Sequence, residues 1–111
     1  MATLDQCRDA LRQLSNLLAS DPEKAARAGL DRTIACHIKD LNAHLHGRLS
    51  GGQISELADG DDPQAKIRLA VNSDELLALV AGKLNFASAW ASGRVSVKAS
   101  FGDLLKLRKL L

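Results

Sequence analysis

Apolar residues in the first twenty positions recur every three or four residues. They are Leu4, Cys7, Leu11, Leu14 and Leu18. This spacing places them along one side of an α-helix, so the stripe is expected to lie on a core. Thr3, followed three residues later by Gln6, resembles a capping box and sets the start of a helix that runs to about residue 20. An Asp-Pro pair at residues 21–22 then predicts a short second helix that ends at Gly29.

From residue 32 the hydrophobic period changes to two, which is the period of a half-buried β-strand. Apolar side chains alternate with others in two successive runs: Ile34, Cys36 and Ile38, then Leu41, Ala43, Leu45 and Leu49. Residues 39–40 separate these runs as a two-residue loop, and residues 50–52 predict a hairpin turn. Ile54 and Leu57 indicate a third, weaker strand before an acidic loop.

Alternation resumes over residues 67–71 and predicts a fourth strand. Ser73 is expected to cap the helix that follows it, and Gly82 is expected to end that helix because glycine tolerates a positive φ. Asn85 is expected to cap a second, short helix that Gly93 ends. The first of these helices is apolar on most sides, which is typical of a buried helix or of one facing something apolar.

A fifth strand is predicted over residues 95–99, before a last helix. Ser100 and Asp103 resemble a capping box at the start of that helix, with aspartate in place of the usual glutamate. Its leucines cover well over half of the circumference: Leu104, Leu105, Leu107, Leu110 and Leu111. So much apolar surface must meet a core, a ligand or another chain.

Together these elements predict an α+β fold, with a five-stranded, mainly antiparallel sheet and helices packed on one face. The first three strands should form a meander. A crossover through two helices should leave the last two strands parallel, with a right-handed connection. The chain has 111 residues, so we expect a single domain over residues 1–111 with one core.

Composition and charge narrow the function classes. The net charge of +2 and the aromatic content of 3% do not favour nucleic acid as a partner. No apolar run approaches the about 20 residues of a membrane span, and the first residues lack a signal-peptide pattern, so a cytoplasmic location is expected. Cys7 and Cys36 fall on apolar faces, which favours two buried, reduced thiols over a disulfide.

The sequence contains no phosphate-binding loop, paired-carboxylate motif or nucleophile motif, so we expect neither enzymatic activity nor a cofactor. His37, His44 and His46 share the polar face of the first hairpin, with His37 expected to lie diagonal to His44. A metal site there is disfavoured against a solvated sheet face, because no carboxylate is expected to join it.

Basic residues follow the same polar face: Lys39, Arg48, Lys66, Arg68, Arg94 and Lys98. Such a row suits anionic lipid headgroups or an acidic partner. The favoured interpretation is the solvated side of an open sheet, because exposed charges gather on such faces.

Residues 66–111 resemble the lipid-binding domain of the sterol carrier protein type two family, also called non-specific lipid-transfer proteins. The matching positions are Ser73, Asp74, Leu76, Leu77, Gly82, Lys83, Leu84, Ala89, Gly93, Arg94, Val95 and Val97, followed by the leucine-rich last helix. Two helix ends and a strand at fixed offsets make the pattern fairly specific. The resemblance implies a pocket for an apolar ligand such as a sterol, a fatty acyl chain or a phospholipid, between the sheet and the helices.

Candidate wall residues come from apolar position and from the family outline. They are Leu77, Val80, Leu84, Phe86, Trp90, Phe101, Leu104, Leu105 and Leu107. The alternative is a non-enzymatic interaction or oligomerisation module, in which the chain's own leucines fill the core. A transient membrane contact and a homo-oligomer both stay open at this point.

Overall fold

The computed structural model describes residues 2–19, 23, 31–50 and 53–110. The helices and strands are α1 (Leu4–Ala19), β1 (Asp31–Ile38), the 3-10 helix η1 (Lys39–Leu41), β2 (Ala43–Ser50), β3 (Gln53–Asp59), β4 (Ile67–Val71), α3 (Ser73–Val80), α4 (Phe86–Ala91), β5 (Ser96–Lys98) and α5 (Phe101–Leu110). The short helix predicted after residue 20 lies outside the described residues, Glu23 excepted, as do the turn glycines at 51–52. Among the described residues, no helix is both long and apolar enough to cross a bilayer.

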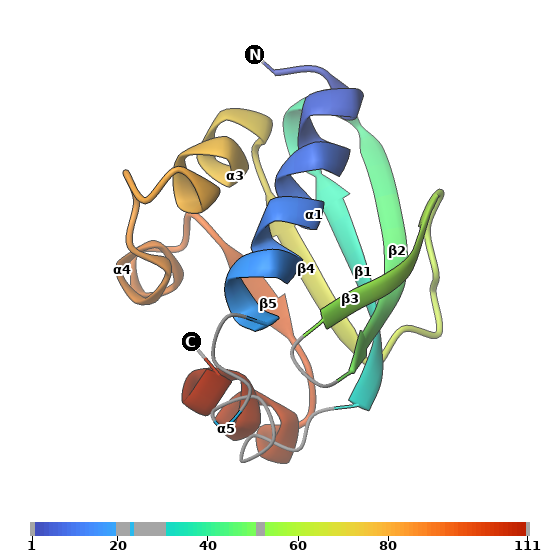
Figure 1. Cartoon of the computed structure of the whole chain (residues 1–111), viewed down its shortest axis with the longest axis vertical. Coiled ribbons are helices and arrows are strands. Elements are labelled where there is room, and N and C mark those ends of the chain that lie inside the picture. Colours follow the sequence, from blue (N-terminus) through green and yellow to red (C-terminus); the bar gives the residue numbers. More distant parts are fainter. Residues whose placement is uncertain (1, 20–22, 24–30, 51–52, 111) are drawn as a thin grey trace.

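The five strands form one sheet in the order β3-β2-β1-β4-β5, with α1 and α3 over one face and α4 and α5 beside β5 (Figure 1). The meander is confirmed, because β1 pairs with β2, and β2 with β3, in antiparallel fashion. The predicted parallel pair was wrong: β4 is parallel to β1, whereas β5 is antiparallel to β4. Helices α3 and α4 connect β4 to β5 without crossing the length of the sheet, so β5 starts at the end of the sheet where β4 finishes.

Helix α1 begins at the predicted capping box. The backbone N–H of Thr3 donates to the side-chain oxygen of Gln6 at 2.8 Å, and the backbone N–H of Gln6 donates to the hydroxyl of Thr3 at 3.2 Å. One turn from the helix end, the buried hydroxyl of Ser15 accepts a hydrogen bond from the backbone N–H of Ile54 at 2.8 Å. The helix is therefore attached to the outermost strand of the sheet as well as packed on its centre.

The connection between β1 and β2 is longer than the predicted two-residue loop. It contains the 3-10 helix and Asn42, which has a φ of 47°. Ile38 consequently faces Ala43 rather than Leu41, and all later pairs of this hairpin shift with it. The shift is large enough to place His37 directly opposite His44 and not diagonal to it.

Strand β3 contains a bulge that explains its unusual apolar spacing. Ser55 pairs with Arg48 and Ala58 with His46, so two residues of β3 lie opposite Gly47 alone. The extra residue, Glu56, has a φ of 56°. Because the bulge shifts the alternation by one residue, Ile54 and Leu57 pack on the same core face although they are three positions apart.

The core lies between α1, α3 and the face of the sheet that carries Cys36 and Leu45. A smaller cluster of Ile34, Leu49 and Ile67 continues it toward α5. The largest fully buried side chains lie in these two clusters or at their edge: Ile38, Leu45, Leu49, Ile67, Cys7 and Ser73.

Ser73 does not cap α3 as predicted. The N-cap residue is Asn72, and the Ser73 hydroxyl instead donates to a carboxylate oxygen of Asp40 at 2.5 Å and accepts from the backbone N–H of Ala2 at 3.1 Å. The backbone N–H of Ser73 also donates to Asp40 at 2.8 Å. Hydrogen bonds from this buried serine lower the pKa of the Asp40 carboxyl below its usual 3.8. One polar contact therefore joins the chain start, the first hairpin and α3.

Replacing Gly47 with alanine should destabilise the protein by about 1–3 kcal/mol, because extra volume in a packed site forces a backbone shift. A Cβ on Gly47 would lie 2.7 Å from the backbone oxygen of Ser55, directly across from the bulge. The control is Gly102→Ala, where a Cβ meets nothing within 4 Å. Urea unfolding of both variants measures the difference, and equal stabilities would contradict the close approach.

Replacing Ser73 with alanine should lower the free energy of unfolding by about 1–2 kcal/mol at neutral pH. The reason is that the buried backbone N–H of Ala2 loses its acceptor, the Ser73 hydroxyl. The pKa of Asp40 is lowered on folding, so its stabilising effect is present above pH 3.8 and is lost as the pH falls further. The variant should therefore lose less stability than the parent between neutral pH and about pH 2. Chemical unfolding across this range, with Ser96→Ala as an exposed control, measures both effects. A parallel pH profile for parent and variant would contradict the assignment.

Candidate apolar ligand site

The core-facing side of the sheet becomes less covered toward β5. Cys36, Leu69 and Val97 form one row across β1, β4 and β5, and all three point to the helix-covered face. Cys36 is only 3% exposed, whereas Leu69 and Val97 are half-buried. Leu69 has a strand on each side, so its exposure comes from incomplete cover by the helices. Apolar sheet surface is therefore accessible near β4 and β5, between the helices that surround it.

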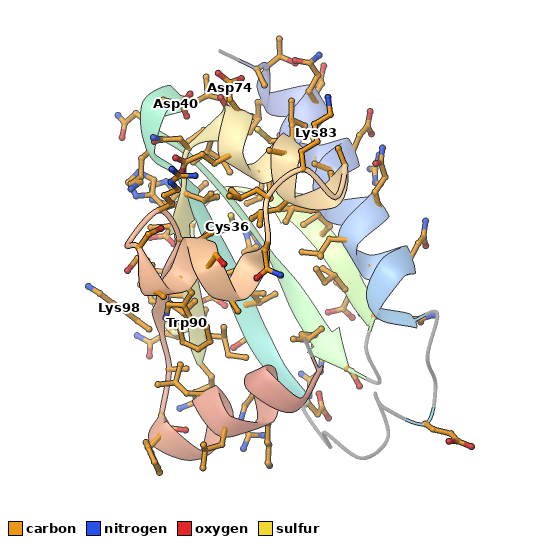
Figure 2. All side chains as sticks on the ribbon, turned by 90° about the vertical axis from the view of Figure 1, so that its left-hand side faces the viewer. Cys36, Asp40, Asp74, Lys83, Trp90 and Lys98 are labelled. Atoms are coloured by element: carbon orange, nitrogen blue, oxygen red, sulfur yellow. The ribbon has the colours of Figure 1, made fainter. Side chains whose placement is uncertain are left out.

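Three predicted wall residues pack against the same buried cluster as Leu69 and Val97. Leu77 and Val80 of α3 are half-buried and pack against the main core cluster, as does Leu84 after that helix. Trp90 of α4 is half-buried, and Figure 2 shows it on the side of α4 that faces α5. Leu104 of α5 is half-buried as well. Leu77, Val80 and Leu84 thus pack against the same buried cluster as Leu69 and Val97, while Trp90 and Leu104 are partly covered side chains on α4 and α5.

Other predicted wall residues do not join this group. Phe101 is 78% exposed and Leu105 is 45% exposed, so both point away from the sheet. The side chains of Phe86 and Leu107 lie outside the described residues. The orientation of α5 could not be predicted from its leucines alone, because they cover most sides of the helix.

An ion pair sets which side of α5 faces the sheet. Arg32 Nε donates to a carboxylate oxygen of Asp103 at 3.2 Å, and the Asp103 side chain is only 7% exposed. The backbone N–H of Asp103 donates to the Ser100 hydroxyl at 3.2 Å, which confirms one half of the predicted capping box. The other half was wrong, because the carboxylate binds Arg32 instead. Sequence reasoning missed Arg32, although its position in the period-two pattern puts it on the same face as Ile34.

The site also contains two thiols that are poor nucleophiles. Cys7 and Cys36 are free and buried in the same core cluster. Burial raises the pKa of Cys7, with the negative charges of Asp40 and Asp74 adding to the effect. Burial, with a smaller contribution from Cys7, raises the pKa of Cys36 to about 12. Because the thiolate is the reactive form, burial makes both thiols weak nucleophiles at neutral pH.

The opposite face of the sheet carries the three histidines. The rings of His37 and His44 stack with their centroids 4.3 Å apart. A carboxylate does join this face, contrary to expectation, because the loop after β3 places Asp61 3.1 Å from the guanidinium of Arg68. Lost solvation raises the pKa of Asp61, but Arg68 and the nearby His44 lower it on balance. No group of three or more potential metal ligands occurs among the residues that the structure describes.

Two of the six members of the predicted basic row, Arg48 and Arg68, form ion pairs with carboxylates. Arg48 is 2.8 Å from Asp31, and Arg68 pairs with Asp61. Lys66 and Lys98 are exposed. The interpretation of this face as a solvated surface is therefore better supported than a headgroup site built from the whole row.

Similar folds occur in two kinds of solved structure. The chain is 24% identical to the stereoselective inverting sec-alkylsulfatase Pisa1 from Pseudomonas sp., with a TM-score of 0.59 over 82% of this chain. It spans only 14% of the sulfatase's length. A double mutant of that sulfatase is 26% identical over 86% of this chain, with a TM-score of 0.62. Palmitated SCP2L2 from Aedes aegypti is 14% identical with a TM-score of 0.67, covering 97% of this chain and 92% of that one.

Comparison with curated proteins gave no match. The family profile described as the SCP-2 sterol transfer family matches residues 11–111, which is nearly the whole chain. That match extends the resemblance seen in residues 66–111 to the first strands and most of α1. It also agrees with the fold, since sterol carrier protein 2 itself superposes with a TM-score of 0.67 over 97% of this chain. The chain therefore belongs to the SCP-2 sterol transfer family.

Proposed function

We propose that this chain binds an apolar ligand, a sterol, fatty acyl chain or phospholipid, against the sheet surface around Leu69 and Val97. The observation that carries the proposal is the partial exposure of these two apolar side chains beside the buried Cys36, on the helix-covered face of the sheet. Membership of a sterol transfer family supports the ligand class, and one similar structure is of a palmitated protein.

The binding energy would come from burial of apolar surface. Each methylene removed from water contributes about 0.8 kcal/mol, so a long acyl chain needs few polar contacts. The proposed walls are Leu77, Val80 and Leu84 on one side and Trp90 and Leu104 on the other. Phe101 and Leu105 are left out of the proposed wall because they face away from it.

A second role is supported by the likeness to the sulfatase. That enzyme is about seven times longer than the segment that this chain matches, so the alkylsulfatase chemistry belongs to a much larger protein. In such a setting this chain would hold the alkyl part of a substrate without performing the reaction. The interaction module with a self-filled core is the remaining alternative, and it requires the Leu69 and Val97 surface to be closed by the chain's own side chains.

Native mass spectrometry of freshly purified protein should show added mass, and an organic extract should contain the matching lipid. The physical reason is that an open apolar surface is expected to retain a lipid from the expression host. Extraction followed by denaturing mass spectrometry identifies the ligand class. A bare protein that also fails to bind fatty acids, sterols or phospholipids in titration would contradict the proposed function.

Replacing Val97 with tryptophan should weaken lipid binding at least tenfold, because the larger side chain occupies the surface proposed for the ligand. The matched control is Ser96→Trp, which adds the same ring one residue away on the opposite face of β5. The affinity for a fluorescent fatty acid measures the effect. Equal affinities of the two variants would remove Val97 from the binding surface.

The stabilities of the Val97→Trp and Ser96→Trp variants distinguish an open apolar surface at Val97 from a core filled by the chain's own side chains. Overfilling a packed core costs about 1–3 kcal/mol, whereas filling open space costs little. We therefore expect Val97→Trp and Ser96→Trp to unfold at similar urea concentrations. A strong loss of stability in Val97→Trp alone would favour the interaction module.

A further inference from the structure

Helix α5 presents its bulkiest exposed apolar side chains to solvent. Phe101 and Leu105 are the large hydrophobic residues that stand out as exposed among the described residues, at 78% and 45%. They are four positions apart and so lie on the same side of the helix. Successive helical residues are rotated by about 100°, so Asp103 lies about 200° from both. Burial of Asp103 against Arg32 therefore turns Phe101 and Leu105 outward.

The part of the chain that carries this exposed face is strongly basic. Residues 83–111 contain six lysines and arginines and a single acidic residue, a net charge of +5. Residues 1–82 contain nine basic and twelve acidic residues, a net charge of −3. The one acidic residue of the basic segment is Asp103, and it is already paired with Arg32. The small net charge of +2 is thus the sum of a negative part, residues 1–82, and a positive part, residues 83–111.

Most of the basic segment is also gathered in space, although Lys83 lies near the end of α3, away from α5 (Figure 2). The basic segment forms α4, β5 and α5, which lie together on one side of the molecule (Figures 1 and 2). Lys98 is exposed just before α5, and Lys106 follows Leu105 within it. An aromatic ring and a leucine on a short helix, with basic residues before and within that helix, are typical of a helix that lies in the interface of a membrane. Such a helix does not span the bilayer.

We propose that α5 docks this chain onto an anionic lipid bilayer, with Phe101 and Leu105 entering the boundary between headgroups and acyl chains. The basic segment supplies the attraction to the charged surface, and the two side chains supply the apolar anchor. An acidic protein would use the same charges, but the pairing of Phe101 with Leu105 on one side of a short helix beside basic residues matches a helix that lies on an anionic bilayer. The proposal rests on the exposed face of α5 and on the charge of its segment, and it is independent of what binds near Leu69.

The test is flotation of the whole chain with vesicles, without added ligand. Vesicles of phosphatidylcholine containing about one-third phosphatidylserine should bind the protein, and vesicles of phosphatidylcholine alone should bind it at least tenfold more weakly. Raising the salt concentration from about 0.1 M to about 0.5 M should release the protein, because exposed charges are screened. Equal binding to both vesicle types, or binding to neither, would overturn the proposal.

Two variants test the residues themselves. The double replacement of Phe101 and Leu105 with serine should reduce vesicle binding at least tenfold, since the apolar anchor is lost. Lys98→Glu should reduce it at least about fivefold, while Lys39→Glu, in η1 and outside the basic segment, should have little effect. Thermal unfolding and the affinity for a fatty acid should stay unchanged in all three, so that failure of docking is distinguishable from failure of the proposed ligand site.

Sedimentation velocity tests whether a second copy of this chain, instead of a bilayer, covers Phe101 and Leu105. We expect the parent chain to be monomeric at the concentrations used for flotation. A dimer that the Phe101 and Leu105 double variant converts to a monomer would assign the exposed face to a second copy and overturn the membrane proposal. Unchanged vesicle binding by the double variant would overturn it as well.

Discussion

The parallel pairing of β1 with β4 is the contact on which the rest of the structure depends. It joins the N-terminal meander to everything that follows residue 66, with Ile34 opposite Ile67 and Ile38 opposite Val71. Without it the meander would end at an open strand, and β5 would have no sheet to join. The same register places Cys36 beside Leu69, and therefore creates the apolar row that runs toward Val97. The candidate ligand surface is thus a direct result of this one pairing.

Local features of the sequence predicted most of the elements, because caps and hydrophobic periods act over a few residues. The capping box at Thr3 is formed as expected, and the side chain of Asn85 accepts from the backbone N–H of Ser88 at 3.1 Å. Strand partners were harder to predict. The position of β4 beside β1 depends on a contact between segments more than 30 residues apart, and no local pattern around residue 67 distinguishes it from the alternative pairing.

The bulge in β3 shows how a local irregularity defeats a periodic argument. Ile54 and Leu57 do not fit a period of two, so the strand looked weak in sequence. The extra residue between them changes the alternation, and Gly47 on the neighbouring strand leaves room for the backbone to approach. A glycine opposite an irregular apolar spacing was the available signal for this bulge.

In the candidate site, too, local pattern predicted some side-chain positions, whereas others depend on a contact between distant parts of the sequence. The packing of Leu77 and Val80 against the core could be predicted because α3 is apolar on most sides, so almost any orientation would direct one of them toward the sheet. Phe101 and Leu105 could not, because the orientation of α5 depends on Arg32, which is 71 residues from Asp103 in sequence. An arginine on the apolar face of β1 marks where a polar partner must arrive, but it does not say which carboxylate will supply it.

Helix α5 cannot satisfy all of its apolar side chains at once. If Phe101 and Leu105 turned toward the sheet, the Asp103 carboxylate would turn toward solvent and leave Arg32 without that partner. Arg32 is 40% exposed, so water screens the ion pair and its contribution to stability is modest. The two possible orientations of α5 therefore differ little in free energy, because each buries an apolar side of the helix and only one of them keeps the ion pair. That balance leaves an aromatic ring in water, which costs free energy unless a third phase, such as the edge of a bilayer, receives it.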